Sequence, residues 1–179
     1  SLIIEPNTVL YNKGTKELDD NKLREQYDFI LSYLNKYGFN RYEVSNFSKG
    51  NVYESKHNLT YWKNEQYYAC GLGASGYENN VRYQNTKNIN EYIKYNFIDS
   101  KEYVDLESDK QYFLITNLRL KEGFLLEDYQ NRYNEKFLDI YKDKVNKLIN
   151  DGLLMVENNS VFPTDDGIML LDTILRTLI

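Results

Sequence analysis

The sequence predicts an α/β fold followed by a small α+β domain, with residues 1–105 in the first part and 106–179 in the second. Two patterns lead to this: a strand–helix–strand order near the start and a helix–hairpin–helix order near the end. Hydrophobic residues make up 41% of the 179 residues, which is enough for a sizeable core.

The first part begins with a strand–helix–strand pattern. The apolar run Leu2–Ile4 predicts a buried strand, and Tyr42–Ser45 predicts a second one. Between them, residues 19–37 carry apolar side chains at helical spacing, with Asp19 at the start and Gly38 just after the end. The apolar face of this helix comprises Leu23, Tyr27, Ile30, Leu31 and Leu34. We therefore expect a βαβ unit in which the helix covers a parallel sheet.

The middle of the chain predicts extended chain with a turn, and then a short helix. Residues 69–85 have the character of extended chain, with a turn near 78–80. Residues 88–97 predict a short helix, and 99–104 predict a connection without regular structure.

The last part predicts three helices, a hairpin and one more helix. The helices are expected at 109–120, 126–133 and 136–150. Glu157–Ser160 is typical of a hairpin turn, and Thr164 followed by two aspartates favours the start of a final helix. This order is typical of a winged-helix-like domain.

Charge and composition exclude several classes. The formal net charge is −5, and residues 107–179 carry nine basic and thirteen acidic side chains, so we expect no nucleic-acid binding. No apolar run is long enough for a membrane span, and the N-terminal residues do not form a secretory signal. The single Cys70 excludes an internal disulfide and suits a reducing cytoplasm; we expect it to be a buried small residue.

The only histidine lies in the segment His57–Trp62, together with Asn58, Tyr61 and the only tryptophan, Trp62. A neutral imidazole can ligate haem iron, and flat aromatic side chains can stack on a porphyrin. The alternative is structural: His57 caps a strand, and Tyr61 and Trp62 pack inward. Chemistry alone leaves both open.

Two further groups are candidates for binding. Gly71, Gly73 and Gly76 have the spacing of a dinucleotide-binding loop, but extended chain rather than a helix is expected after them. Close backbone packing at a bend, or the edge of a small-molecule site, is the better interpretation. Glu5 and Glu43 each lie at the C-terminal end of a predicted parallel strand, so they are either a shared ligand site or two exposed carboxylates.

Several blocks occur together in one known family. These are Ile3–Thr8, Tyr42–Phe47, His57–Trp62, Gly71–Tyr77 and Arg82–Asn85. In this order they resemble the C-terminal half of HemW-type proteins, radical-SAM relatives of oxygen-independent coproporphyrinogen III oxidase. The resemblance covers essentially the whole chain.

The resemblance implies that residues 1–105 are the end of a partial (β/α)6 barrel and that 106–179 are the family's C-terminal domain. It implies haem as ligand, bound by His57, Asn58, Tyr61 and Trp62 with His57 on the iron. Glu5, Glu43, Gly73, Ala74 and Ser75 would face S-adenosylmethionine or substrate. The [4Fe–4S] cysteines of the family are absent here, so they are expected upstream of Ser1.

Two functions follow from the resemblance. The first is a haem chaperone that passes haem to respiratory proteins at the membrane, which implies a cytoplasmic or membrane-peripheral location. The second is an oxygen-independent coproporphyrinogen III oxidase-like enzyme. A protein-binding winged-helix module is a third candidate. Exposed sheet edges in a fragment also favour self-association.

Overall fold

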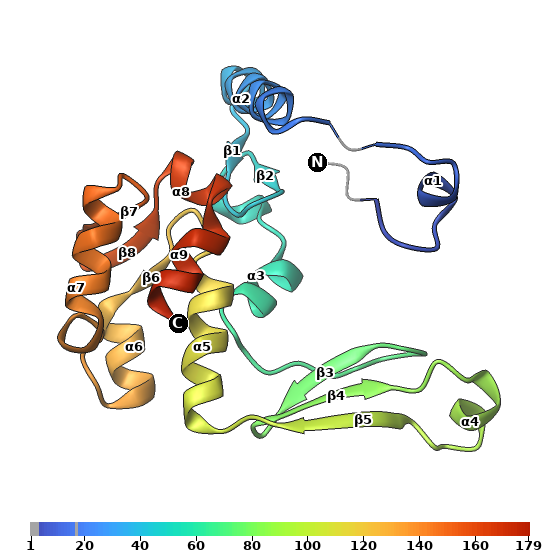
Figure 1. Cartoon of the computed structure of the whole chain (residues 1–179). Helices are drawn as coiled ribbons and strands as arrows, with labels where there is room; N and C mark the ends of the chain where they lie inside the picture. Colours follow the sequence, from blue (N-terminus) through green and yellow to red (C-terminus); the bar gives the residue numbers. More distant parts are fainter. Residues whose placement is uncertain (1–3, 17) are drawn as a thin grey trace. The chain divides into compact units, whose positions relative to one another are not determined.

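A computed structural model describes residues 4–16 and 18–179 (Figure 1). The chain forms two compact units. The first contains the residues up to Arg41 together with Phe47–Tyr53, and the second contains Tyr42–Asn46 and Glu54–Ile179. The described helices include none with the length and apolar character needed to cross a bilayer.

The first unit is built around helix α2, Asp20–Lys36. The carboxylate of Asp19 accepts hydrogen bonds from two backbone amides of the first turn, and Gly38 follows the helix at a φ of +79°. The helix predicted at 19–37 is therefore confirmed, with the expected caps at both ends. The shorter elements of this unit are α1 (Val9–Asn12), β1 (Asn40–Arg41), β2 (Phe47–Ser48) and the 3₁₀ helix Asn51–Tyr53.

The parallel strand predicted at Tyr42–Ser45 is not formed. This segment connects β1 to β2, which pair with each other antiparallel. Its own backbone bonds go to the residues after helix α5 (Leu106–Asn117): Val44 N–H donates to the Arg119 carbonyl, and Glu43 forms an isolated antiparallel bridge with Leu120. This single bridge is enough to bond the backbone of the segment without a ladder of paired residues. The alternating pattern at Tyr42–Ser45 therefore belongs to a short connecting segment and not to a strand.

The strand predicted at Leu2–Ile4 lies, except for Ile4, outside the described residues. Ile4 itself is in no strand. Within residues 4–16 and 18–179 every strand pair is antiparallel. The predicted parallel βαβ unit is therefore absent from the part of the chain that the structure describes.

A three-stranded antiparallel sheet forms the middle of the second unit. It comprises β3 (Ser75–Glu78), β4 (Val81–Asn85) and β5 (Ile98–Tyr103) in that order. Asn79 and Asn80 have φ values of +50° and +61°, which two-residue hairpin turns of type I′ require. The extended chain predicted at 69–85 and its turn near 78–80 are thus confirmed in β3 and β4, whereas the connection predicted at 99–104 is wrong, because β5 pairs with β4 there.

Helix α4, Ile89–Ile93, connects β4 to β5 at the far end of this sheet (Figure 1). It confirms the short helix predicted at 88–97, with Asn88 as its N-cap. The carbonyl of Phe97 accepts a hydrogen bond from the Thr86 amide, which closes the loop around the helix.

The end of the chain follows the predicted order of helices and hairpin. Helix α5 begins at Leu106 rather than 109, because the carboxylate of Asp105 accepts a hydrogen bond from the Ser108 amide and caps it. The predicted final helix is divided at Leu170 into two. The remaining elements are β6 (Phe124–Leu125), α6 (Leu126–Tyr133), α7 (Phe137–Asn150), β7 (Leu154–Glu157), β8 (Ser160–Pro163), α8 (Asp165–Met169) and α9 (Leu171–Leu178).

The hydrophobic core lies among these last elements and is rich in aromatic rings. Phe113 of α5 packs edge-to-face against Phe124 with ring centroids 5.1 Å apart, and Phe124 does the same with Phe137 at 5.1 Å. Leu114, Leu118 and other aliphatic side chains fill the space around the rings and are fully buried. The strands β6, β8 and β7 form a small antiparallel sheet beside this core.

Gly123 is the tightest point of this packing, and we predict that Gly123→Ala destabilises the fold. A Cβ on Gly123 would lie 1.9 Å from the Val161 carbonyl oxygen, where backbone cannot yield. Gly152→Ala is a matched control, because Gly152 has a similar φ of +73° but open space around it. Urea unfolding should give a loss for Gly123→Ala that exceeds the control by roughly 2 kcal/mol or more. Equal losses would mean that only the left-handed backbone matters.

Candidate functional site

The segment with the only histidine forms a helix. Helix α3 runs from Lys56 to Trp62, and the hydroxyl of Ser55 accepts a hydrogen bond from the Asn58 amide at its start. The alternative of a packed strand is therefore wrong. The overlooked signal was Ser55, a good N-cap residue directly before the segment. A helix places His57 and Tyr61 on one face and Asn58 and Trp62 on the next.

His57 is the exposed end of a row of aromatic rings. Its imidazole lies edge-on to the ring of Tyr61 with centroids 4.7 Å apart, and Tyr61 lies edge-on to Tyr67 at 4.4 Å. Within the described residues neither imidazole nitrogen has a hydrogen-bond partner. The ring is thus oriented by packing while its nitrogens stay available to a ligand, which is what axial ligation of haem iron needs.

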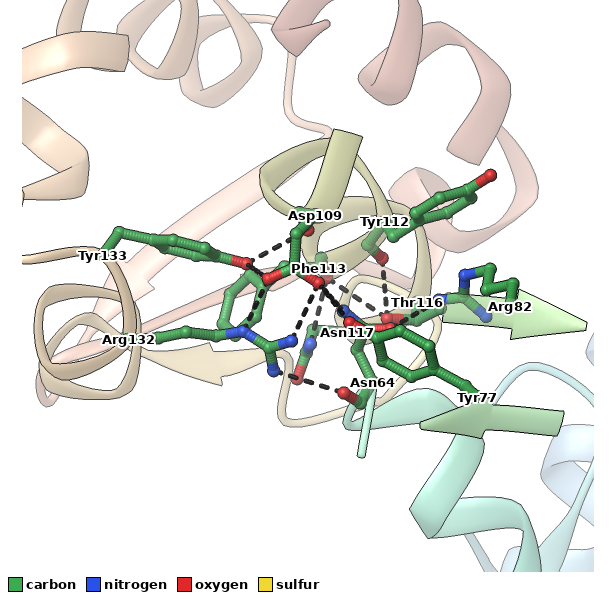
Figure 2. A network of polar contacts seen from close by, with 10 residues as sticks. All are labelled: Asn64, Tyr77, Arg82, Asp109, Tyr112, Phe113, Thr116, Asn117, Arg132 and Tyr133. Atoms are coloured by element: carbon green, nitrogen blue, oxygen red, sulfur yellow. Dashed lines mark hydrogen bonds and ion pairs between the residues drawn. The ribbon is translucent and has the colours of Figure 1, made fainter. Parts of the chain in front are cut away.

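Asn64, two residues after the end of α3, connects this helix to the rest of the second unit (Figure 2). Asn64 is 2% exposed and has a left-handed φ of +52°. Its side-chain NH₂ donates to Asp109 Oδ1 at 3.0 Å, and its side-chain oxygen accepts from Arg82 at 2.7 Å. Its carbonyl accepts from Arg132 at 3.2 Å. The side-chain NH₂, the side-chain oxygen and the backbone carbonyl of Asn64 are thus all bonded, and together they fix the position of the C-terminal end of α3.

Asp109 of α5 is the centre of this network (Figure 2). Its Oδ1 accepts from Asn64, from the Tyr77 hydroxyl at 3.0 Å and from Arg132 Nη2 at 2.8 Å. Its Oδ2 accepts from Arg132 Nε at 2.8 Å and from the Tyr133 hydroxyl at 2.9 Å. The carboxylate thereby joins the end of α3 to strand β3 and helix α6.

The pKa of Asp109 is lowered below its ordinary value of 3.8. Burial is the largest single influence and would raise the pKa, but the hydrogen bonds from Arg132, Tyr133 and Tyr77 and the Arg132 charge outweigh it. The pKa values of Tyr77 and Tyr133 are raised, in both cases first by burial, so these hydroxyls stay protonated as donors.

Arg82 is held between two aromatic rings next to this network. Its guanidinium carbon lies 4.4 Å from the ring centroid of Tyr77 and 4.1 Å from that of Tyr112. The Tyr112 hydroxyl in turn donates to Glu102 of β5 at 2.8 Å. None of these residues was among the predicted site residues, because partners so far apart in sequence leave no local pattern.

The glycine-rich segment is a bend that leads into β3. Gly71 and Gly73 have φ values of +103° and +65°, and the Asn85 side chain donates to the Gly71 carbonyl at 2.9 Å. Gly76 pairs with Tyr83 in the sheet, and a Cβ there would lie 2.3 Å from the Tyr83 ring. The expected close backbone packing is confirmed at Gly76. Ala74 precedes β3 half-buried, and Ser75 is exposed at its first position.

The remaining candidates lie elsewhere. Glu5 is exposed in the first unit. Glu43 belongs to the second unit, is 1% exposed and accepts a hydrogen bond from the Asn46 side chain. Glu43 forms an isolated bridge rather than part of a parallel strand, and the strand predicted before Glu5 lies mostly outside the described residues. Cys70 is exposed, so its predicted burial is wrong. Among residues 4–16 and 18–179, no cluster of three or more His, Cys, Asp or Glu side chains could hold a metal ion.

Comparison with known proteins gives similar chains over almost the full length. Residues 112–170 match the family described as HemN C-terminal domain. The heme chaperone HemW of Lactococcus lactis is 36% identical over 177 residues, which cover 95% of this chain and 46% of that protein. The Bacillus subtilis heme chaperone HemW is 33% identical over 180 residues, covering 95% and 47%.

The fold also resembles a solved structure, that of the radical-SAM enzyme coproporphyrinogen III oxidase (HemN) from Escherichia coli. The TM-score is 0.66 at 11% identity, over 90% of this chain and 42% of that one. This likeness concerns the fold alone and agrees with the predicted mixture of α and β structure. The resemblance to HemW-type proteins inferred from the sequence blocks is confirmed, and the chain spans about half the length of these relatives.

We predict that Asp109→Asn destabilises the second unit strongly. The substitution leaves the Arg132 guanidinium, whose side chain is 31% exposed, without its anionic partner and turns one acceptor oxygen into a donor. Loss of one member of such a pair costs about 3 kcal/mol in the free energy of unfolding. Asp143→Asn, an exposed position on α7, removes the same charge and should cost little. A similar small loss for both variants would contradict the central role of Asp109.

The same variant predicts a pH dependence. Because the folded pKa of Asp109 is lowered, its contribution is present above the unfolded pKa and disappears as the pH falls through the folded value. The difference in unfolding free energy between the unmodified chain and Asp109→Asn should therefore be large at about pH 6 and shrink below about pH 4. Denaturant titrations at a series of pH values measure it. A difference that grows on acidification would show that the sign is wrong.

Proposed function

From its similarity to HemW-type proteins over 95% of its length, we propose that the chain is the haem-binding half of a HemW-type haem chaperone. One observation carries the proposal: the only histidine is exposed on α3, with its ring oriented against Tyr61 and its nitrogens unbonded among the described residues. An imidazole presented in this way is suited to ligate haem iron.

The residues of α3 fit the ligand. His57 supplies the axial nitrogen. Tyr61 and Trp62 supply flat apolar surface beside it, and the half-buried Asn58 supplies an amide for a polar edge. Haem is the cargo in this proposal and has to leave again. A single protein ligand on an exposed helix face supports such a role, because release requires only one metal bond to break.

The longer protein would carry further groups. We propose that it holds a [4Fe–4S] cluster and S-adenosylmethionine, with cluster ligands that this chain does not supply, because it has one cysteine. Glu5, Glu43 and residues 73–75 are our candidates for contacting S-adenosylmethionine or substrate. Residues 1–105 would be the end of a partial (β/α)6 barrel, and 106–179 a winged-helix-like domain.

The proposed recipients are haem-requiring respiratory proteins at the membrane, which the chaperone would reach from the cytoplasm. The alternative function is an oxygen-independent coproporphyrinogen III oxidase-like reaction, and the HemN-like fold is compatible with it. One assay of the longer protein, with its cluster intact, distinguishes the chaperone function from the oxidase function. Anaerobic decarboxylation of coproporphyrinogen III supports the oxidase, and haem transfer to an apo-cytochrome without decarboxylation supports the chaperone.

We predict that His57→Ala removes the iron ligand. Titration of haemin into the chain should give a shifted Soret band, and the variant should lose this shift and bind at least about tenfold more weakly. Lys56→Ala is the matched control, because Lys56 is the exposed neighbour of His57 on the same helix. An unchanged spectrum and affinity in His57→Ala would exclude His57 as the ligand.

A further inference from the structure

Arg119 lies beside the histidine-bearing helix but comes from the segment after α5. Its guanidinium carbon is 5.4 Å from the ring centroid of Trp62, within range of a cation–π contact. Its backbone is fixed on both sides, since its amide donates to the Thr116 carbonyl at 3.1 Å and its own carbonyl accepts from Val44 at 3.0 Å. The side chain is half-buried. Arg119 is therefore held in place next to α3.

The guanidinium of Arg119 lacks an acceptor. Within residues 4–16 and 18–179 it makes no hydrogen bond and no ion pair, whereas Arg132 is bonded to Asp109 and Arg82 to Asn64. Glu43 forms a bridge with the adjacent Leu120, but its carboxylate accepts from Asn46 instead. A half-buried guanidinium retains five donors in a planar fork that matches a carboxylate.

A second unsatisfied donor belongs to Trp62, the residue whose ring Arg119 contacts. The indole Nε1–H of Trp62 is buried and has no hydrogen-bond partner among the described residues. Buried donors normally have one, so its absence marks a position where polar contacts are incomplete. Both unsatisfied donors belong to Arg119 and Trp62, and both lie at the C-terminal end of the helix that carries His57.

We propose that Arg119 binds a carboxylate of the tetrapyrrole whose iron His57 ligates. Positions 57 and 62 are separated by about 7.5 Å along the helix axis and by about 140° around it, so a tetrapyrrole bound at His57 reaches Arg119 with carboxylates that extend around the side of α3 toward Trp62. There the guanidinium, lying on the indole, offers a bidentate charged hydrogen bond. This inference rests on the proposed function and adds to it the group that recognises the acidic edge of the ligand.

The test separates Arg119 from iron ligation by using metal-free protoporphyrin IX and its dimethyl ester. Trp62 is the only tryptophan, so quenching of its fluorescence reports binding at this site. The unmodified chain should bind the free acid more tightly than the ester. In Arg119→Gln the affinity for the free acid should fall about tenfold, while that for the ester stays nearly constant. Arg119→Lys keeps the charge but not the planar fork of donors, so its affinity for the free acid should lie between those of the unmodified chain and Arg119→Gln.

Arg176→Gln is the charge control, because Arg176 is an exposed arginine on α9, and it should leave both affinities unchanged. Circular dichroism confirms that each variant folds. Equal affinity of the unmodified chain for acid and ester, no porphyrin binding at all, or equal loss of both in Arg119→Gln would overturn the proposal. A failed His57 assignment is seen separately, as an unaltered haemin spectrum in His57→Ala, and leaves the acid–ester difference to stand by itself.

Discussion

The buried carboxylate of Asp109 is the contact on which the second unit depends. It is 9% exposed, and a charge removed from water at that depth is unfavourable unless it is compensated. Two bonds from Arg132 neutralise it, and donors from Asn64, Tyr77 and Tyr133 satisfy its remaining lone pairs. Because these donors come from three separate segments, one carboxylate on α5 fixes the positions of all three (Figure 2).

Helix α3 depends on this network more than longer helices would. It has seven residues, and a helix of that length is unstable in isolation. Its N-terminus has the Ser55 cap, but its C-terminus continues into Asn64, whose side chain and carbonyl are bonded to Asp109, Arg82 and Arg132. The position of the C-terminal end of α3 is thus set by residues of β4, α5 and α6, while Tyr61 of α3 orients the His57 ring.

The contrast between what could and could not be predicted has a physical basis. Features encoded by a few neighbouring residues were predicted correctly. Asp19 indicated the start of α2, and the turn expected near 78–80 is formed by Asn79 and Asn80 as a type I′ turn. The βαβ unit failed because Tyr42–Ser45 has the composition of a strand but only one bridging partner, Leu120. Strand β5 was missed because all its residues are exposed, so it lacks the apolar alternation that marks a half-buried strand.

The candidate site divides in the same way. His57, Asn58, Tyr61 and Trp62 were found from the sequence because they are close together in it, and the strand that the structural alternative assumed there is a helix. Asp109 and Arg119 were missed, since their partners on α3 and just beyond it lie more than forty residues away in sequence. A single charged residue at either position is not unusual in the sequence.

Asp109 and Arg119 act in opposite ways on the same helix. The carboxylate of Asp109 has every acceptor position filled and therefore favours one arrangement of α3, Asn64 and α6. Among the described residues the Arg119 guanidinium has no acceptor for its donors, and it lies on Trp62, so it gains most when an anion binds. A rigid support with an unsatisfied cation at one end and an unbonded imidazole near the other is preorganised for a ligand that is both metal-bearing and acidic. Since little of the support has to reorder on binding, the entropic cost of binding such a ligand is reduced.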